Sequence, residues 1–257
     1  MTAVIEYIGI LFLRFVEEAG RICILFLNAV RQMFRRPFEA DIIIKQMVEI
    51  GVKSLPVVII TALFTGMVLA VQSYTGFKRF GAQSVVGFVV SLSMVRELGP
   101  VLTGLIVAGR AGASMAAELG TMRVTEQIDA LETLAANPVK YLVVPRFIST
   151  TLMMPALAAV ADLVGIVGGF MVTVKLFGVS STTYWKWTWN YLDYKDIYYG
   201  LVKAAFFGAC IAMISCSNGF YTQGGAEGVG KATTRAVVLS SITILVSDYF
   251  LSAWMFR

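Results

Sequence analysis

Three charged residues interrupt stretches of sequence that are otherwise apolar enough to cross a membrane. Arg96 and Glu97 stand in the middle of residues 80–109, and Lys203 stands within residues 197–220. A charged side chain near the centre of a bilayer costs at least ~2.5–3.5 kcal/mol unless it is paired or hydrated. The surrounding protein must therefore stabilise these charges. Whether it does so with ion pairs or with a hydrated site determines whether the residues are structural or functional.

Two interpretations of these charges remain open at the level of sequence. In the first, the cations form structural ion pairs with carboxylates from other apolar stretches, for example Asp162 or Asp248. In the second, a hydrated cavity brings Arg96 and Lys203, with Glu97 beside them, to an anionic ligand group such as a phosphate. Arginine offers such a group a planar fork of donors, and lysine offers a point charge.

Several kinds of chemistry are excluded or disfavoured by composition. The chain contains no histidine, which removes the usual general base and every Ser-His or Cys-His nucleophile. Cys23, Cys210 and Cys216 lie in apolar surroundings without CxxC spacing, so we expect neither a disulfide framework nor a metal site. The net charge of +5 is better explained by membrane orientation than by nucleic-acid binding.

A glycine-rich segment, residues 225–232, nearly matches the phosphate-binding pattern GxxxxGK[ST]. The match fails at Ala232, which supplies no hydroxyl for magnesium, and the segment follows an apolar stretch of membrane length and not a buried strand. We therefore predict that this chain binds no nucleotide or other cofactor here. The glycines instead predict a tight turn at the membrane surface.

Residues 125–137 predict a short amphipathic helix between the second and third apolar stretches. Acidic residues recur every three positions, and apolar residues do the same on a neighbouring face. The acids are Glu126, Asp129 and Glu132, and the apolar residues are Ile128, Leu131 and Leu134. The helix could rest on the membrane, but its acids gain nothing there from anionic lipid. A docking element for a soluble partner is the favoured interpretation.

The overall composition predicts an all-α integral membrane protein. Of the 257 residues, 58% are apolar and 14% are charged, whereas a soluble domain is typically about half apolar and about a quarter charged. A spanning helix needs ~20 predominantly apolar residues, and five stretches meet that requirement. They are residues 54–77, 80–109, 147–174, 197–220 and 236–256.

The second of these stretches is expected to be kinked or discontinuous, because Gly99 and Pro100 follow the charged pair. A row of small residues continues beyond it at intervals of four and predicts close helix packing rather than chemistry. The row consists of Gly104, Ala108, Gly112, Ala116 and Gly120. Residues 180–196 are predicted to be a polar loop whose aromatic side chains form an interfacial belt.

Residues 1–36 are apolar, but charges interrupt them too often for an ordinary span. Their polar residues recur at intervals of three, four and seven, which places them in one narrow stripe on a helix. The stripe consists of Arg14, Glu17, Glu18, Arg21, Asn28, Arg31, Gln32 and Arg35. This pattern predicts a helix lying in the membrane interface, with a first spanning helix as the alternative. Residues 37–53 are predicted to be a short amphipathic connector.

The distribution of Lys and Arg predicts the orientation of the spans. With the N-terminus in the cytoplasm, thirteen of the 21 basic residues fall on the cytoplasmic side, six on the other side and two within the membrane. Because cytoplasmic loops are enriched in Lys and Arg, we expect a cytoplasmic N-terminus and a C-terminus on the opposite side.

Several segments together resemble the permease family of the Mla (maintenance of lipid asymmetry) system. The most specific are RELGPVLT at 96–103, AGRAGA at 108–113, AAELGTM at 116–122 and TEQIDAL at 125–131. Further similar segments are PVKYLVVPR at 138–146, GGAEGVG at 224–230 and ATTRAVV at 232–238. The resemblance covers about residues 40–257 and includes the glycine-rich segment, which supports the absence of a nucleotide site there.

The resemblance implies a transport subunit, not an enzyme. Proteins of this family are permeases of ABC transporters that move phospholipid between the inner and outer membranes of Gram-negative bacteria, and so maintain lipid asymmetry. The chain would be one permease domain, residues 1–257, with interfacial and connecting helices in 1–53 and the transmembrane bundle in 54–257. Its C-terminus would be periplasmic and its location the inner membrane. Lipid would lie near Arg96 and Lys203, with Glu97 beside them.

The resemblance also implies partners. Two permeases would form a homodimer, and a cytoplasmic ATPase that uses ATP and Mg would dock on a coupling helix at residues 125–137. The matching candidates for that contact are Glu126, Asp129, Leu131 and Glu132. A periplasmic lipid-binding ring of the MCE type would sit above the dimer, and a small STAS-domain protein would bind the ATPase.

Two other functions compete with this expectation. An ion- or proton-coupled secondary transporter is suggested by Asp162, Lys203 and Asp248 within spans, but the chain lacks the internal repeat that such folds often show. A membrane scaffold that assembles partners without transporting lipid is the second rival.

Overall fold

The computed structural model describes residues 2–34 and 40–255, and throughout these residues the ordered elements are helices. Five of the helical segments are long and apolar enough to cross a membrane, as predicted. They are Ala40–Lys78, Gln83–Val124, Val139–Leu176, Tyr194–Phe220 and Gly225–Met255. The predicted contributions of Arg35, Arg36 and Arg257 to the polar stripe and to orientation lie outside the described residues.

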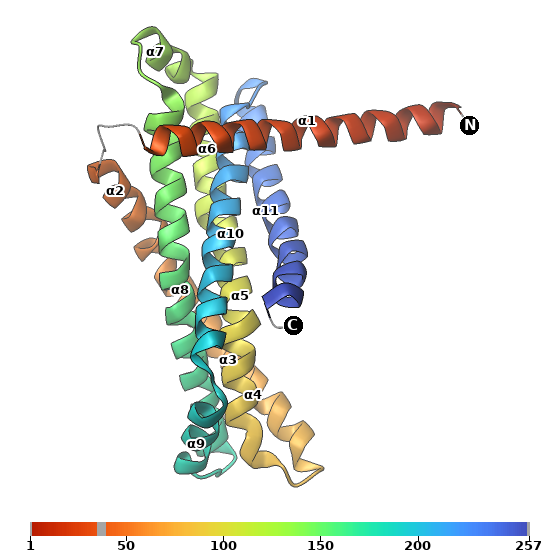
Figure 1. Ribbon diagram of the computed structural model, residues 1–257, viewed down its shortest axis with the longest axis vertical. Coiled ribbons are helices and arrows are strands. Elements are labelled where there is room, and N and C mark those ends of the chain that lie inside the picture. Colours follow the sequence, from red (N-terminus) through yellow and green to blue (C-terminus); the bar gives the residue numbers. More distant parts are fainter. Residues whose placement is uncertain (1, 35–39, 256–257) are drawn as a thin grey trace.

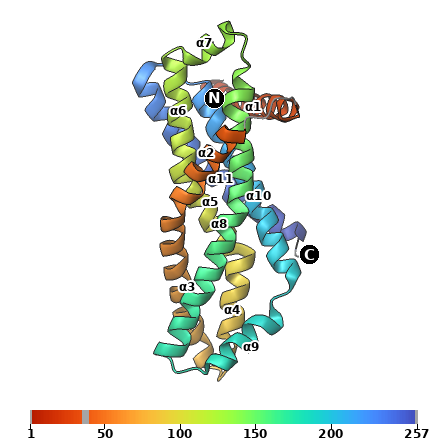
Figure 2. The same ribbon diagram turned by 90° about the vertical axis from the view of Figure 1, so that its left-hand side faces the viewer.

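The spans run roughly along the long axis of the molecule (Figure 1). Helix α1 (Thr2–Met33) lies across one end of this bundle, and the short helix α7 (Gln127–Thr133) projects from the same end. Helix α9 (Ser181–Tyr191) lies at the opposite end (Figures 1 and 2). Helix α1 therefore runs across the direction of the spans and not along it (Figure 1).

The first predicted span, residues 54–77, is confirmed as a helix with nearly the same bounds, and a helical connector precedes it. Helix α2 (Ala40–Ile50) leads through a 3-10 turn (Val52–Ser54) into α3 (Leu55–Lys78), so the predicted connector is itself helical. Gly51 allows the close contact at this junction, because a Cβ there would lie 2.1 Å from Met153 Cε. The junction thus packs directly against the third span.

The second span is one helical path with two π-helical turns. Its segments in order are α4 (Val86–Ser93), a π-turn (Met94–Leu98), α5 (Gly99–Val107), a second π-turn (Ala108–Gly112) and α6 (Ala113–Val124). The expected discontinuity at Gly99 and Pro100 was wrong, because the chain stays helical there and the charged pair lies in a π-turn. Each π-turn carries an arginine at its centre. Arg110, in the second, donates from Nε to Ser54 Oγ (3.0 Å) at the α2–α3 junction.

Helix α8 (Val144–Phe170) is the centre of the bundle and packs against α3 and α10 (Tyr194–Phe220). The closest approach is at Gly66 of α3, where a Cβ would lie 1.9 Å from the carbonyl oxygen of Gly165. Absent side chains let these two backbones touch.

The predicted row of small residues also faces other helices. Added Cβ atoms at Gly104, Gly112 and Gly120 would lie 2.9–3.2 Å from side-chain atoms on α10, on the turn after it, or on α11 (Gly225–Met255). The prediction of close packing along this row is therefore confirmed.

The segment predicted to be an aromatic loop is instead largely helical, because α9 covers Ser181–Tyr191. Aromatic side chains spaced four residues apart stack along this helix, Trp185 on Trp189 and Trp187 on Tyr191. Tyr184 is fully buried and donates its hydroxyl to the carbonyl of Ile166 at 2.9 Å. Burial raises the pKa of this phenol, which keeps it a neutral donor.

The glycine-rich segment is a turn over only part of its predicted length. Gly224 and Gly225 adopt positive φ angles of 92° and 66°, which an L side chain disfavours. From Gly225 onward the chain is helical, so residues 226–231 form the first turns of α11. The prediction of a turn through Lys231 was therefore wrong. Within this segment the positive φ angles are confined to the two adjacent glycines, and the following residues form ordinary helix.

Candidate functional site

The first π-turn exposes a backbone carbonyl inside the bundle. Pro100 has no N–H, so the carbonyl of Arg96, four residues earlier, cannot receive the usual helical hydrogen bond. Lys203 of α10 supplies the missing donor, with its Nζ 2.9 Å from that oxygen. The sequence Arg96–Pro100 thus creates a local acceptor, and a lysine from another span satisfies it.

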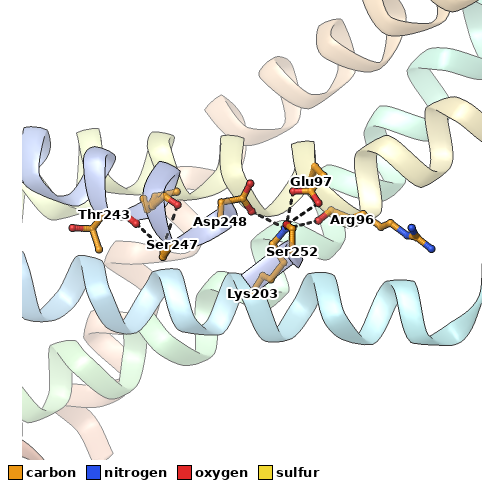
Figure 3. Close-up of polar contacts among 8 residues, drawn as sticks. Arg96, Glu97, Lys203, Thr243, Ser247, Asp248 and Ser252 are labelled. Carbon is orange, nitrogen blue, oxygen red and sulfur yellow. Dashed lines mark hydrogen bonds and ion pairs between the residues drawn. The ribbon is translucent and has the colours of Figure 1, made fainter. Parts of the chain in front are cut away.

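Lys203 is also the centre of an ion network that joins three spans (Figure 3). Its Nζ lies 2.7 Å from Glu97 Oε2 in the π-turn and 2.7 Å from Asp248 Oδ1 on α11. It also donates to Ser252 Oγ at 2.8 Å, and Ser252 donates to Glu97 Oε1 at 2.9 Å. The lysine side chain has no exposed surface. Two carboxylates therefore compensate one buried ammonium.

Arg96 is held on a different side of the π-turn. Its guanidinium points away from Lys203 (Figure 3) and contacts Asp196 near the start of α10, with Nε 2.8 Å and Nη2 2.7 Å from Oδ1. Asp196 is itself fixed, because its other oxygen accepts from the backbone N–H of Asp193 in a capping box. The Arg96 side chain remains 35% exposed. It is therefore an anchored guanidinium that still reaches the outer surface of this chain.

The structure brings together the side chains of Glu97 and Lys203, whereas Arg96 joins this pair only through its backbone carbonyl. Arg96 and Glu97 are partly exposed, at 35% and 39% of their side chains, whereas Lys203 is enclosed. The structural pairing of Lys203 with Asp248 is confirmed, and Arg96 pairs with a carboxylate that the sequence did not single out.

The other candidate carboxylate, Asp162 of α8, lies behind the same π-turn. A Cβ at Gly99 would stand 1.8 Å from its Oδ1, so only glycine fits there. Asp162 Oδ1 is buried and has no hydrogen-bond partner among the described residues. The partners that sequence reasoning missed are Asp196 and Ser252. The only sequence signal for Asp196 is the capping pattern Asp193-x-x-Asp196.

An apolar groove of about 370 Å³ lies between α10 and α11, the two helices that carry Lys203 and Asp248. Its lining is almost entirely apolar, with two hydroxyl side chains, and comprises Phe206, Ile242, Thr243, Val246, Ser247, Phe250 and Leu251. Charged groups and an apolar groove thus occur on the same pair of helices.

The predicted docking helix is present but shorter than expected, since α7 covers Gln127–Thr133. Ile128 is fully buried and fixes the helix to the bundle, with Leu131 packed beside it. Asp129 is paired with Arg123 of α6 at 2.5 Å, whereas Glu126 and Glu132 are exposed. Of the predicted contact acids, the two exposed ones are available to a partner in this conformation.

The fold and site together define a multi-pass α-helical membrane protein that holds an ion network inside its bundle. Residues 43–254 match the family described as Permease MlaE. The chain therefore belongs to the MlaE permease family, as its sequence segments indicated.

Individual relatives agree with this assignment. A probable ABC transporter permease protein of Rickettsia bellii is 50% identical over 250 residues, which are 97% of this chain and 96% of that protein. The intermembrane phospholipid transport system permease protein MlaE of Haemophilus influenzae is 37% identical over 255 residues, 98% of this chain and 97% of that protein. The chloroplastic protein TRIGALACTOSYLDIACYLGLYCEROL 1 of Arabidopsis thaliana is 40% identical over 214 residues, 83% of this chain and 61% of that protein. Membership of an ABC permease family implies an ABC ATPase as partner.

Proposed function

We propose that this chain is the membrane subunit of an ATP-driven transporter that moves phospholipid between the inner and outer membranes and so maintains lipid asymmetry. The observation that carries the proposal is Arg96, a partly exposed guanidinium inside an apolar span and fixed by Asp196. A cation at this position costs free energy unless it has an anionic partner. A phospholipid phosphate is a second partner that matches the guanidinium fork.

The ion network around Lys203 has a positioning role in this proposal. Lys203 is enclosed, so it acts by holding the Glu97 carboxylate and the backbone carbonyl of Arg96 at the π-turn. The apolar groove between α10 and α11 supplies a surface for acyl chains near the same helices. The phosphate at Arg96 and the acyl chains in the groove would thus each meet a chemically matching surface of the chain.

The proposed partners follow from the family and fit the exposed surfaces. A second copy of the chain would cover the exposed apolar face of α11, which carries Val238, Ile242, Leu245 and Tyr249. The ATPase, which binds ATP and Mg, would contact Glu126, just before α7, and Leu131 and Glu132 within it. The end that carries α1 and α7 would then be cytoplasmic and the end that carries α9 periplasmic. An MCE-type lipid-binding ring would sit at the periplasmic end, and a STAS-domain protein would bind the ATPase. The location would be the inner membrane.

The test is phospholipid transport between vesicles by the reconstituted complex with its ATPase. Arg96→Gln should lower the ATP-dependent rate about tenfold or more, because a charge-assisted hydrogen bond to a ligand is worth ~1.5–3 kcal/mol. The matched control is Arg79→Gln, which removes an exposed arginine beyond the end of α3. Assembly of both complexes is checked by size-exclusion chromatography, because Arg96→Gln also removes the cation that pairs with the buried Asp196, and the rates are compared for assembled complex only.

A wild-type rate in Arg96→Gln would exclude a direct role of this guanidinium. The same assay separates the rival functions. Transport by the chain alone under an ion gradient would support a secondary transporter, and assembly without any lipid movement would support a scaffold.

A further inference from the structure

A polar pocket lies at the end of the bundle that carries α1. Its lining includes none of the residues of the Arg96 and Lys203 site. Its volume is about 410 Å³, within the ~300–1,000 Å³ that is usual for small-molecule sites. Helix α1, the end of α10 and the first turns of α11 form its walls. The proposed transport function makes no use of this pocket.

The pocket is placed at a membrane surface by the ends of two spans. Helix α10 ends at Phe220 and α11 begins at Gly225, so the turn at 221–224 marks where the chain leaves the apolar region. Helix α1 crosses the bundle at this level (Figure 1) and leaves Ile24 and Leu27 at 58% and 65% exposure. These side chains suit the boundary between headgroups and acyl chains.

The walls of the pocket carry both signs of charge. Glu17, Glu18 and Arg21 come from α1, and Lys231 and Arg235 come from α11. Each cation has a carboxylate partner. Arg21 pairs with Glu17 at 2.5 Å, and Glu18 pairs with Arg235 across the pocket. Lys231 pairs with Glu227 at 2.6 Å just outside the lining.

These ion pairs can be exchanged for a ligand. The side chains of Arg21, Lys231 and Arg235 are 50%, 76% and 58% exposed, and exposed pairs contribute only ~0–1 kcal/mol. A phosphate forms stronger, charge-assisted bonds with such cations. A phosphate bound to Lys231 and Arg235 would break the ion pair between Arg235 and Glu18. The Glu18 carboxylate then lacks a partner unless the ligand also carries a positive charge.

We infer that this pocket binds a zwitterionic phospholipid headgroup, a phosphate that carries an ammonium group. The phosphate lies between Lys231 and Arg235, and the ammonium lies against Glu17 and Glu18. A zwitterion replaces the existing pairs without changing the total charge of the pocket. Arg21 is held over the ring of Tyr221, with its Cζ 5.5 Å from the ring centroid, and closes the side wall. The acyl chains lie along the exposed apolar side of α1.

The test uses the full complex in nanodiscs. A phosphatidylethanolamine with a photoreactive group on an acyl chain, near the glycerol, should label peptides from α1 or from residues 217–235. Lys231→Glu with Arg235→Glu should reduce this labelling about tenfold or more, because the phosphate loses two charge-assisted contacts. The matched control, Lys78→Glu with Arg79→Glu, makes the same charge change beyond the opposite end of the bundle and should keep wild-type labelling.

Two further arms define the ligand. Glycerophosphoethanolamine should compete with the label, and inorganic phosphate should not. Glu17→Gln with Glu18→Gln should shift the preference of the site from ethanolamine to glycerol headgroups, since the ammonium loses its partners. Assembly of every variant is checked by size-exclusion chromatography.

Three results would overturn the inference. They are labelling of wild type only at other segments, equal competition by inorganic phosphate, and an unchanged headgroup preference in the Glu17/Glu18 variant. None of these depends on the Arg96 transport assay, so failure of the pocket and failure of the proposed function are distinguishable.

Discussion

At the scale of single residues, Lys203 shows how a buried charge is tolerated in this bundle. Its ammonium group has three protons, and four oxygen atoms surround it, from Arg96, Glu97, Asp248 and Ser252. One of these oxygens is a backbone carbonyl that Pro100 leaves without a donor. The lysine therefore supplies the hydrogen bond that the helix lacks at Arg96 and also neutralises two carboxylates.

Removal of this ammonium should be costly. Lys203→Met leaves Glu97 and Asp248 without their shared cation, and breaking a buried ion pair from one side typically costs ~3–5 kcal/mol. We expect a large loss of thermal stability of the purified protein in detergent. Lys186→Met, an exposed position on α9, should change little. Adding Glu97→Gln and Asp248→Asn to Lys203→Met should restore part of the loss, and wild-type stability of the single variant would refute the structural role of the network.

The sequence predicted the members of this site better than their partners. Charges within apolar spans stand out, so Arg96, Glu97 and Lys203 could be found. Neighbouring residues on a helix project in different directions, and the side chains of Arg96 and Glu97 accordingly meet different partners. Which partner each one meets depends on the rotation of the π-turn. For Arg96 that partner is Asp196, outside the stretches that appeared to be transmembrane.

At the scale of elements, a prediction succeeded where the sequence pattern is compatible with only one kind of secondary structure. The apolar stretches and the row of small residues were predicted correctly, since length and spacing determine both. The aromatic segment was misjudged as a loop, because polar and aromatic composition does not reveal that rings four residues apart stack on α9. The glycine-rich segment was likewise predicted to be a turn from its composition, whereas only Gly224 and Gly225 have positive φ and the other glycines lie in α11.

The docking role of α7 can be tested at its two exposed acids. Glu126→Lys with Glu132→Lys should release the ATPase from the purified complex, because both side chains are exposed and their charge would be reversed at the contact. Asp129 is left unchanged, since it pairs with Arg123 and its reversal would disturb the α6–α7 connection. Asp41→Lys, an exposed acid on α2, is the control. Stoichiometric co-purification of the ATPase with the double variant would show that these acids do not carry the contact.

At the scale of the whole molecule, the spans are covered very unevenly. The most apolar window of the α8 span is 56% buried, whereas that of α11 is 17% buried. Four large side chains on α11 recur at intervals of four, three and four and so share one helix face. They are Val238, Ile242, Leu245 and Tyr249, and each is about half exposed or more. This face is where a second copy of the chain would pack in the proposed dimer.

Single cysteines along this face should therefore cross-link two copies. In a Cys23→Ser background, chosen because Cys23 is exposed, we expect an oxidised dimer from at least one of positions 238, 242, 245 and 249. A disulfide needs Cα atoms ~4.4–6.8 Å apart, so only positions near the two-fold axis will react. Leu152→Cys and Leu163→Cys, equally exposed on α8, should remain monomeric. Dimers from the α8 positions and none from α11 would place the contact between copies on the opposite side of the bundle.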